Sequence, residues 1–460
     1  MNAATGRPPR RRGRYAGPRP SASPRGLPLA GQSLELEVGP VAHGGFCVAR
    51  HEGQVVFVRH TLPGERVRAV VTDGGSEDRF LRADAVEVLQ ASADRVEPVC
   101  RHAGLGGCGG CDWQHASVEA QRRLKGEVVA EQLRRLAGLD LPVVVEPLPG
   151  DVDGFGWRTR VEFAVDAGGR AGLRRHRSHE VIPVAECPIA DPRVLASGVL
   201  EGDWSGSRAV DVVAPSGGGS VVVVPVRVPV RVPGGADEVP VVRERVESPS
   251  WTGEFEVSAR GFWQVHPGAA ATFVDAILRG LDPRPGDWVL DLYAGAGLFA
   301  VPLADAVGPG GRVLAVEGDV VAVNAARVNC RGRDWVEVLA GRVEDVLAQL
   351  SGESSQDSAA SPAGRAGGQV AADIAAEGSV DLVVLDPPRT GAGRAVIEAV
   401  AALAPRAIAY VACDPAALAR DLAYARAAGY ALGGLTAYDA FPMTHHVECV
   451  AVLRPVPAST

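Results

Sequence analysis

The sequence contains almost no lysine and few aromatic residues. Lys125 is the only lysine among the 47 lysine and arginine residues of the 460-residue chain, and Phe, Trp and Tyr together make up 5%. This bias is typical of a high-GC coding preference, so the abundance of arginine does not by itself indicate a nucleic-acid partner. The net charge of -8 argues against a protein that coats nucleic acid with its whole surface. A polyanionic partner would have to bind at a local basic patch.

Long apolar runs are also missing. The sequence has no run of about twenty apolar residues, and its start lacks the short apolar core of a secretory signal. We therefore expect a cytoplasmic protein with no membrane partner. Cysteines are few as well, eight in all, yet Cys100, Cys108 and Cys111 lie close together. In a reducing compartment such a group favours a metal-binding or catalytic device over a set of disulfides.

The length predicts two or three domains, preceded by a tail. Residues 1–28 are rich in Arg, Pro, Gly and Ser and contain no acid, so we expect them to be disordered. They are either a solvated tail or an arm that binds a polyanion. The start is also similar in composition to a transit peptide, but the amphipathic helical pattern of such a peptide is absent.

Short β-rich runs separated by glycine turns predict a small antiparallel barrel over residues 29–92. Residues 93–258 form a β-rich central domain, in which apolar spacing predicts a helix over 116–138 that packs on the catalytic domain. The prolines of the run "SVVVVPVRVPVRVP" (220–233) indicate an edge strand. Strands and helices alternate over 259–460, which predicts a parallel, doubly wound sheet, interrupted by a disordered insertion at 351–379. The fold class is therefore α/β, with a Rossmann-like domain preceded by an OB-like barrel and a β-rich central domain.

The segment "VLDLYAGAGLFA" combines a strand with a glycine-rich turn. Asp291 ends this strand, and Glu317 ends the next strand, where a carboxylate can accept hydrogen bonds from both hydroxyls of a ribose. The turn is shorter than a dinucleotide fingerprint. It resembles the S-adenosylmethionine loop of Rossmann-like methyltransferases, and we favour that ligand over NAD.

Three further motifs follow strands of the same sheet. "LDPPR" places Asp386 at the ligand-binding edge, and similar Asp-Pro-Pro tetrads hold a target base in methyltransferases. "YVACDP" places Cys413 before a forced turn, and "FPMTHHVECV" supplies Glu448 at the start of a final strand. A thiol and a carboxylate are a nucleophile and base pair. Addition of Cys413 to C6 of uridine would make C5 nucleophilic enough to take a methyl group, and Glu448 would then remove the C5 proton. Because both faces of the base must be reached, we expect the nucleotide to be flipped out of its stack.

These motifs together resemble the RNA uridine-5-methyltransferases, in the branch with an N-terminal TRAM domain and an iron-sulfur cluster. The motifs that carry the resemblance are "CDPAALARD", "FPMTHHVE", "ARGFWQVHP" and "GLRRHRSHEVIPVAECPI". The resemblance implies Cys413 and Glu448 as catalytic residues, Gln264, Tyr293, Glu317 and Asp386 as ligands of S-adenosylmethionine, and Phe262 near the RNA base. The sequence departs from the family at Ala412, Asp414, Met443 and His266, and we expect any altered contact to the base at His266.

The cysteine group acquires a candidate chemistry from the same resemblance. Four thiolates suit Zn²⁺ and a [4Fe-4S] cluster equally well on spacing, and ligand type alone favours zinc. The resemblance instead implies a [4Fe-4S] cluster on Cys100, Cys108, Cys111 and Cys187. The spacing is not the Cys-x3-Cys-x2-Cys of radical enzymes, and four protein ligands leave no open iron, so we expect no radical chemistry there. The cluster would hold the central domain together, and a redox role in RNA binding stays open.

We expect RNA to contact the barrel and a basic central segment that contains Arg158, Arg160, Arg170, Arg174, Arg175 and Arg177. The expected protein is a monomer that methylates a structured RNA, ribosomal RNA before transfer RNA. Two alternatives stay open: methylation of a base amino group, in which Cys413 and Glu448 have no covalent role, and a non-catalytic, cluster-bearing RNA-binding protein.

Overall fold

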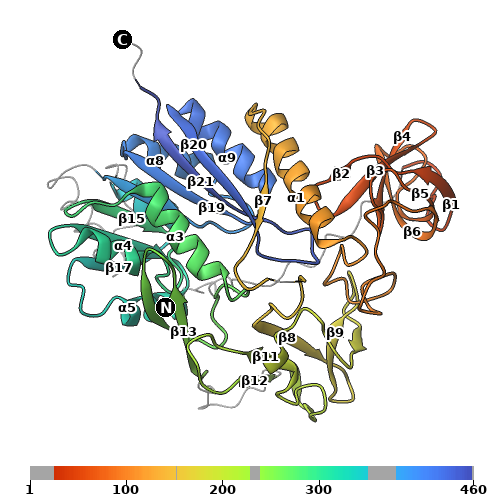
Figure 1. Cartoon of the computed structure of the whole chain (residues 1–460), viewed down its shortest axis with the longest axis horizontal. Helices are drawn as coiled ribbons and strands as arrows, with labels where there is room; N and C mark the ends of the chain where they lie inside the picture. The colour runs from red at the N-terminus through yellow and green to blue at the C-terminus, as the bar shows by residue number, and fades with distance from the viewer. Residues whose placement is uncertain (1–24, 152, 228–238, 351–379, 458–460) are drawn as a thin grey trace, which may run out of the picture.

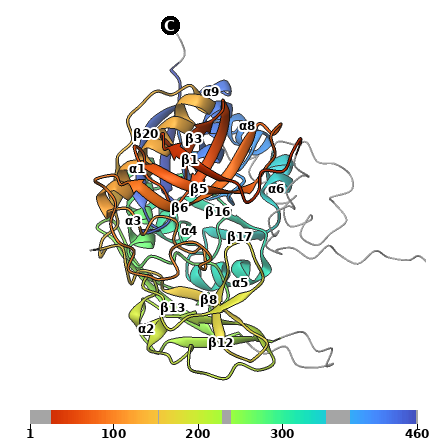
Figure 2. The same ribbon diagram turned by 90° about the vertical axis from the view of Figure 1, so that its right-hand side faces the viewer.

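The computed structural model describes residues 25–151, 153–227, 239–350 and 380–457. Most of the predicted tail (1–28) and the whole predicted insertion (351–379) lie outside the described residues. Residues 25–28 pair with the barrel: the Leu27 amide donates to Ser76 Oγ, and Pro28 bridges to Gly75. Figure 1 shows the barrel at the right, the central sheet below, and the large catalytic sheet with its helices at the left; in Figure 2 the barrel faces the viewer.

The N-terminal barrel forms because alternate residues of each strand are apolar. In β3, for example, Cys47 and Ala49 are buried while their neighbours are partly exposed. The strands are arranged in the order β1-β5-β6-β4-β3-β2. Their bounds are β1 (Ser33–Glu37), β2 (Val41–Ala42), β3 (Phe46–His51), β4 (Gln54–Arg59), β5 (Arg66–Asp73) and β6 (Phe80–Gln90).

The central region contains a five-stranded sheet with the order β10-β9-β8-β11-β12. The β12 strand lies at the edge, where Pro225 faces Val210 of β11, so the edge position predicted from the prolines is confirmed for this strand. The elements are β8 (Arg160–Val165), β9 (Ala171–Arg174), β10 (Val181–Pro183), α2 (Pro192–Leu195), β11 (Ser207–Val213) and β12 (Val222–Arg227).

The catalytic sheet has the order β17-β16-β15-β18-β19-β21-β20-β7. The first five strands of this order are parallel, β21 pairs antiparallel with both β19 and β20, and β20 pairs in parallel with β7. The strands are β7 (Val145–Pro147), β15 (Trp288–Leu292), β16 (Arg312–Glu317), β17 (Val336–Ala340), β18 (Leu382–Leu385), β19 (Ala407–Ala412), β20 (Tyr430–Asp439) and β21 (Glu448–Pro455).

Helices cover both faces of this sheet and enclose two apolar cores. One core contains residues of α3 (Ala269–Leu281), α4 (Ala300–Val307) and α5 (Val320–Asn329); the other contains residues of α6 (Val343–Leu350), α8 (Arg394–Ala402) and α9 (Pro415–Ala427). Helices on both faces of a mostly parallel sheet are the predicted doubly wound architecture.

Segments that precede residue 259 complete the catalytic domain. Strand β7 is the last strand of its sheet, and the hairpin of β13 (Val241–Glu247) and β14 (Thr252–Ser258) contributes Phe255 to the first core. The sequence-based boundary at 258–259 is therefore not a boundary of packing. A chain folded in this way brings the central region and the catalytic sheet into one structural unit.

The helix predicted over 116–138 is α1 (Val118–Gln132), continued by the π-helical turn η1 (Leu133–Ala137). Ser117 caps it by accepting a hydrogen bond from the Ala120 amide. One face of α1 places Leu124 in the barrel core, and another places Val129 in the second core of the catalytic domain. Gly126 allows the close approach of the chain leading into β7, because a Cβ atom there would lie 2.4 Å from the Val143 carbonyl oxygen. Figure 1 shows α1 between the barrel and the catalytic sheet.

Candidate active site

The carboxyl ends of the parallel strands gather five of the predicted residues at one edge of the catalytic sheet. Strand pairing aligns Leu292, Val316 and Leu385 across β15, β16 and β18. The residues that directly follow or end these strands are therefore neighbours at that edge, as the fold requires. They are Tyr293, Glu317 and Asp386, and the next strands add Cys413 and Glu448.

Glu317 is fixed by the turns around it. Its Oε2 accepts a hydrogen bond from the Gly295 amide at 3.1 Å, and its Oε1 accepts one from the Asp319 amide at 2.6 Å. Gly295 has a φ of +56° and Tyr293 a φ of +66°, so the chain turns sharply where the strand ends. A non-glycine residue in the left-handed region is strained, which is typical of a functional loop.

Two acids lie beside this loop, the buried Asp291 and the partly buried Asp386. Burial, with a contribution from Asp386, raises the pKa of Asp291 to about 8, and burial together with Glu317 raises the pKa of Asp386 to about 7. The Ala300 amide acts in the opposite direction on Asp291, yet neither carboxylate oxygen of Asp291 makes a full hydrogen bond among the described residues. A group of acids that repel one another in a dry site favours a cationic ligand.

Cys413 and Glu448 face each other across two antiparallel strands. Ala412 of β19 pairs with Cys449 of β21, so the residue after Ala412 lies next to the residue before Cys449. Burial raises the pKa of the Cys413 thiol to about 12, with Glu448 as the next cause. Burial also raises the pKa of Glu448 well above its usual range.

The charge of Arg389 acts on both members of this pair. Its positive charge lowers the pKa of both Cys413 and Glu448, against the effect of burial. Its Nη2 lies 2.9 Å from Nε2 of His446, whose pKa falls to about 3 because of burial and the neighbouring His445 and Arg389. The guanidinium of Arg389 is therefore held by a neutral imidazole and stays available to offset negative charge on the pair.

The two loops that carry Cys413 and Glu448 are held by residues from the N-terminal half of the chain. Asp414 caps α9 through the Ala417 amide and pairs with His43 of the barrel at 3.1 Å. Gln121 of α1 accepts a hydrogen bond from the Met443 amide at 2.8 Å, and Lys125 pairs with Asp439 at 2.5 Å. Sequence reasoning missed these supports, although a single lysine in an arginine-rich chain was a signal that could have pointed to one of them.

The loop that precedes α3 carries the remaining residues predicted to contact the cofactor or the RNA base. Gln264 is buried, whereas the side chain of Phe262 is 72% exposed. His266 is buried, stacks on Trp157 at 6.2 Å and accepts a hydrogen bond from the Gly268 amide through Nδ1. This departure from the family pattern thus packs inside the protein, and its Nε2 has no hydrogen-bond partner in the described part of the chain.

Comparison with known proteins identifies the family. The pattern of the tRNA (uracil-5-)-methyltransferases matches residues 254–456, and that of the TRAM domain matches residues 29–86. A Streptomyces avermitilis protein named "Uncharacterized RNA methyltransferase" is 50% identical over 458 residues, covering 92% of this chain and 99% of the relative. A Halomonas elongata protein named 23S rRNA (uracil(1939)-C(5))-methyltransferase RlmD is 32% identical, covering 97% of this chain and 95% of the relative. The chain belongs to the RNA (uracil-C5)-methyltransferase family.

The fold of this methyltransferase is shared with a solved structure. The tRNA (uracil-54, C5)-methyltransferase of Pyrococcus abyssi, in complex with S-adenosyl-L-homocysteine, has a TM-score of 0.63 at 20% identity and covers 91% of this chain and 100% of that one. The predicted family, the fold class and the enzymatic activity are confirmed: the protein is an S-adenosylmethionine-dependent RNA methyltransferase of the uracil-C5 class. None of the helices in the described ranges combines the length and apolar character needed to cross a bilayer.

The four predicted cluster cysteines of the methyltransferase line one small cavity of about 20 Å³: Cys100, Cys108, Cys111 and Cys187. All four are free thiols. Burial is the largest cause of the raised pKa of Cys108, Cys111 and Cys187, and neighbouring cysteines raise each of these further. Within the described residues, no three His, Cys, Asp or Glu side chains are grouped in a way that would hold a metal ion.

The predicted RNA-binding arginines are placed differently from one another. Arg174 and Arg175 lie on the surface, where they pair with Glu162 and Glu180. The Arg160 side chain is only 9% exposed; it pairs with Glu244 and donates to carbonyl groups of the turn before Phe262. Arg158 donates to the Arg160 carbonyl, and its charge lowers the pKa of Cys108 and Cys187.

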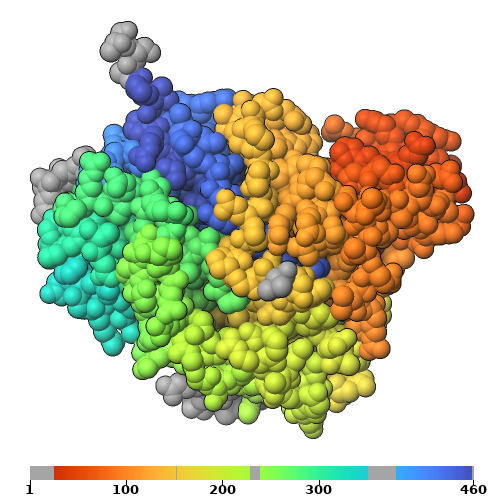
Figure 3. All heavy atoms as spheres, viewed as in Figure 1, coloured from red at the N-terminus to blue at the C-terminus, as the bar shows by residue number. Residues whose placement is uncertain are grey.

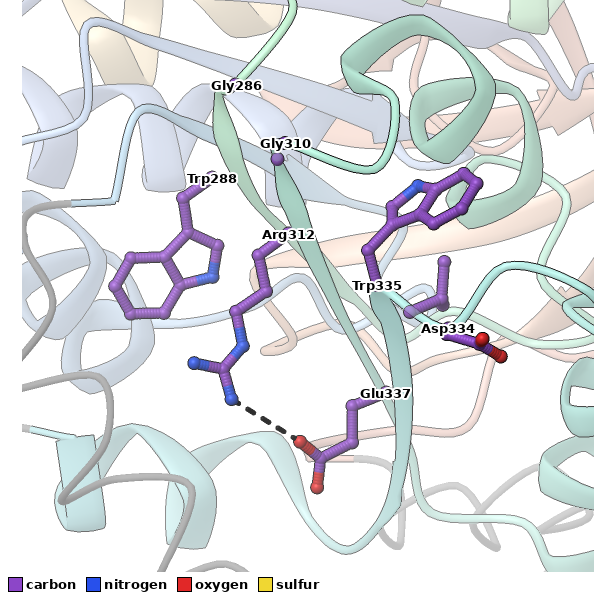
Figure 4. Close-up of a pocket in the computed structure, with 9 residues that line it drawn as sticks. Gly286, Trp288, Gly310, Arg312, Asp334, Trp335 and Glu337 are labelled. Atoms are coloured by element: carbon purple, nitrogen blue, oxygen red, sulfur yellow. Dashed lines mark ion pairs between the residues drawn. The ribbon is translucent and has the colours of Figure 1, made fainter.

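A cavity of about 500 Å³ lies at the opposite edge of the catalytic sheet, at the amino ends of β15, β16 and β17. Figure 4 shows Trp288 and Arg312 beside this cavity, with Arg312 directed toward Glu337 at 3.7 Å. Because ligands of open α/β sheets bind at the carboxyl ends of the strands, we assign this cavity no part in methyl transfer.

Proposed function

We propose that the methyltransferase methylates C5 of uridine in ribosomal RNA, with Cys413 as nucleophile and Glu448 as base. The observation that carries this assignment is the alignment of the two side chains across β19 and β21, beside the acids at the carboxyl edge of the sheet. The Cys413 thiolate adds to C6 and the ring becomes an enolate at C5. S-adenosylmethionine supplies the methyl group when it is bound. Glu448 then removes the C5 proton, the C5–C6 double bond re-forms, and the thiolate leaves.

The proposed steps require both side chains of the pair to lose a proton first. The raised pKa values favour the protonated forms of Cys413 and Glu448 in the free protein, so Cys413 must release its proton before it adds to C6, and Glu448 must release its proton before it accepts the one from C5. Arg389, held by His446, favours the thiolate form of Cys413 and offsets negative charge as it develops on the uracil ring.

The donor-binding role is proposed for Gln264, Tyr293, Glu317 and Asp386. Glu317 stands where a carboxylate accepts hydrogen bonds from ribose hydroxyls, since the strand β16 ends there next to the glycine turn. The negative charge of Asp386 favours a sulfonium. Phe262, largely exposed on a loop held by Arg160, is proposed to contact the RNA base. Arg174 and Arg175 would contact RNA by exchanging their ion pairs with Glu162 and Glu180 for ion pairs with phosphates. Arg158 would affect RNA binding indirectly, through its charge beside the cysteines.

Ribosomal RNA is the favoured target because relatives that align with this chain over nearly its full length are named for 23S rRNA. The Pyrococcus abyssi enzyme of the same fold is named for tRNA, so transfer RNA is the second candidate. Mapping 5-methyluridine in both RNA classes from cells with and without the gene tests this choice. We also propose a monomer that works in the cytoplasm, which sedimentation and cell fractionation would test.

A [4Fe-4S] cluster on Cys100, Cys108, Cys111 and Cys187 is proposed for the cysteine cavity. The support is that four free thiols line one cavity, the number of ligands that a [4Fe-4S] cluster takes. The described side chains are not grouped closely enough to hold a metal ion, so cluster binding would have to draw the four thiols together. Arg158 supplies a positive charge beside the thiolates. Such a centre would hold the segment around Cys100 to the segment around Cys187. Anaerobically purified protein should contain about four iron and four sulfide per chain, and Cys187→Ser should lower that content.

Incubation with RNA that contains 5-fluorouridine tests the function. The fluorine cannot be removed as a proton, so wild-type protein should stay covalently attached to the RNA after methyl transfer, and Cys413→Ala should form no adduct. With ordinary RNA, Glu448→Gln should accumulate the methylated covalent intermediate. Methylation of exocyclic amino groups without any adduct would favour the amino-group alternative. RNA and donor binding without methylation would favour the non-catalytic one.

A further inference from the structure

The outer face of the barrel carries an unusual set of side chains. Inward residues of β3, β4 and β6 form the barrel core, so the alternate residues of the same strands point outward. Register pairs Phe57 with Arg82 and Val55 with Phe80, and β3 lies beside β4 in the sheet. Three of the ten phenylalanines of the chain, Phe46, Phe57 and Phe80, thereby share this outward face with Arg82.

The three rings form one continuous group. The Phe46 and Phe57 centroids lie 6.1 Å apart, those of Phe57 and Phe80 lie 5.4 Å apart, and both pairs meet edge to face. The Arg82 guanidinium lies 6.0 Å from the centre of the Phe46 ring and 5.6 Å from that of Phe80. Phe80 is 42% exposed, and the other two rings are partly exposed. Aromatic rings with a cation between them on an exposed sheet face are suited to stack nucleobases.

Positive charge borders these rings. Arg177, in the turn between β9 and β10, lies near Arg59 and Arg82, and burial together with these two arginines lowers its pKa. Asp84 and Asp73 act in the opposite direction. Arg59 is 4.0 Å from Asp84, whereas Arg82 and Arg177 make no ion pair within the described residues. Uncompensated arginine charge beside aromatic rings suits a single nucleic-acid strand, because the arginines can bind its phosphates and the rings can stack its bases.

The turn that precedes Phe46 contacts both loops of the candidate active site. His43, in the turn before Phe46, pairs with Asp414, the residue after Cys413. In the same turn Gly45 packs against His445, because a Cβ atom at Gly45 would lie 3.0 Å from that of His445. Figure 3 shows the barrel as a lobe that projects from the rest of the molecule and joins it along one side. An RNA strand that leaves the active site past His43 would therefore pass the barrel near the ring of Phe46.

We propose that Phe46, Phe57, Phe80 and Arg82 form a stacking platform for unpaired nucleotides that flank the target uridine. This inference rests on the proposed function, because it takes the RNA whose uridine is bound at Cys413 as the occupant. The RNA bases would stack on the three rings, and Arg82 and Arg177 would bind the phosphates between these bases. The barrel would thus select substrates whose target lies in a single-stranded or unfolded stretch.

The test compares two RNAs that share the target uridine: a short oligonucleotide that ends a few nucleotides from it, and a longer one with an unpaired flank. In Phe57→Ala/Phe80→Ala the long RNA should bind more weakly by on the order of tenfold or more, while binding of the short RNA should not change. Phe57→Tyr/Phe80→Tyr should bind the long RNA as the wild type does, because tyrosine also stacks. Val241→Ala, an exposed apolar residue on the remote β13 strand, is the matched control for loss of surface.

Arg82→Gln should reduce the dependence of long-RNA binding on salt by about one counterion. Equal binding of the long RNA by wild type and the alanine variant would overturn the platform, and so would equal losses for both RNAs. The 5-fluorouridine adduct separates the two proposals. If wild type binds RNA but forms no adduct, the uridine mechanism fails. If wild type forms the adduct and the alanine variant keeps its affinity for the flank, only the platform fails.

Discussion

At the scale of single residues, the acids of the proposed donor site should favour the positively charged sulfonium of S-adenosylmethionine over the neutral sulfur of S-adenosylhomocysteine. In the free protein the pKa of Asp386 is about 7 and that of Asp291 about 8, because both are buried beside other acids. A cation bound beside them favours their ionised forms, so binding expels protons. Affinity for a cation must therefore rise as the pH rises through these values and level off above them.

We predict that S-adenosylmethionine binds more tightly at pH 8 than at pH 6, by up to about tenfold per pH unit for each proton released. S-adenosylhomocysteine, whose sulfur is neutral, should show a smaller change. Calorimetric titration of both ligands across this range measures the difference. In Asp386→Asn the two ligands should differ less in how their affinity changes with pH. An unchanged difference would show that Asp386 does not belong to the donor site.

The nucleophile gives a second pH dependence. The pKa of Cys413 is raised to about 12, first by burial and next by Glu448, so little thiolate exists at neutral pH. The rate of 5-fluorouridine adduct formation should rise with pH between 6.5 and 9, by up to about tenfold per unit. Glu448→Gln removes one cause of the raised pKa, so its profile should shift to lower pH. A rate independent of pH would show that deprotonation of Cys413 does not limit the addition.

The sequence predicted a candidate nucleophile and base but not the contacts that hold their loops in place. Cys413 and Glu448 could be predicted from local motifs. Cys413 directly follows the strand β19 and Glu448 begins the strand β21, and each position is visible in a short stretch of sequence. The contacts of His43 with Asp414 and of Gln121 with Met443 join residues more than 300 positions apart. No local pattern encodes such contacts, since they arise only when the barrel and α1 dock on the catalytic domain.

At the scale of elements, α1 fixes the loop that leads to Glu448. Lys125 and Asp439 have fully buried side chains, and the Lys125 ammonium also donates to the Phe441 carbonyl at 3.0 Å. Arg122 lies 3.5 Å from Asp439, so removal of Lys125 leaves the buried carboxylate with one distant cation in place of a close one in a dry site. The chain thus uses its only lysine where a compact ammonium fits between a carboxylate and a carbonyl oxygen.

We predict that Lys125→Met lowers the free energy of unfolding by about 3–5 kcal/mol. The control is Arg123→Met on the same helix, whose exposed pair with Asp94 should contribute less than about 1 kcal/mol. Denaturant titration of both variants measures the difference. Lys125→Met/Asp439→Leu should recover much of the stability, because the double variant buries no lone charge. Equal small losses in Lys125→Met and Arg123→Met would contradict the buried pair.

At the scale of the whole molecule, the sequence predicted the classes of the parts better than the way they interlock. The barrel, the central β-rich region and the doubly wound sheet each have a clear local periodicity. Their packing does not: Trp113 and Leu124 enter the barrel core from outside the barrel, and Phe255 enters a core of the catalytic domain. Long-range docking of this kind depends on surfaces that exist only after each part has folded.

This interlocking predicts how fragments behave. A fragment of residues 259–460 contains the predicted catalytic domain, but it lacks β7 at the end of the sheet, the α1 and η1 residues in one core, and the β13–β14 hairpin in the other. Loss of these elements exposes apolar surface on both faces of the sheet. The fragment should therefore unfold at lower denaturant concentration and less cooperatively than a fragment of residues 93–460, as circular dichroism would measure. If 259–460 matches the longer fragment in both respects, the elements before residue 259 contribute no stability to the catalytic sheet.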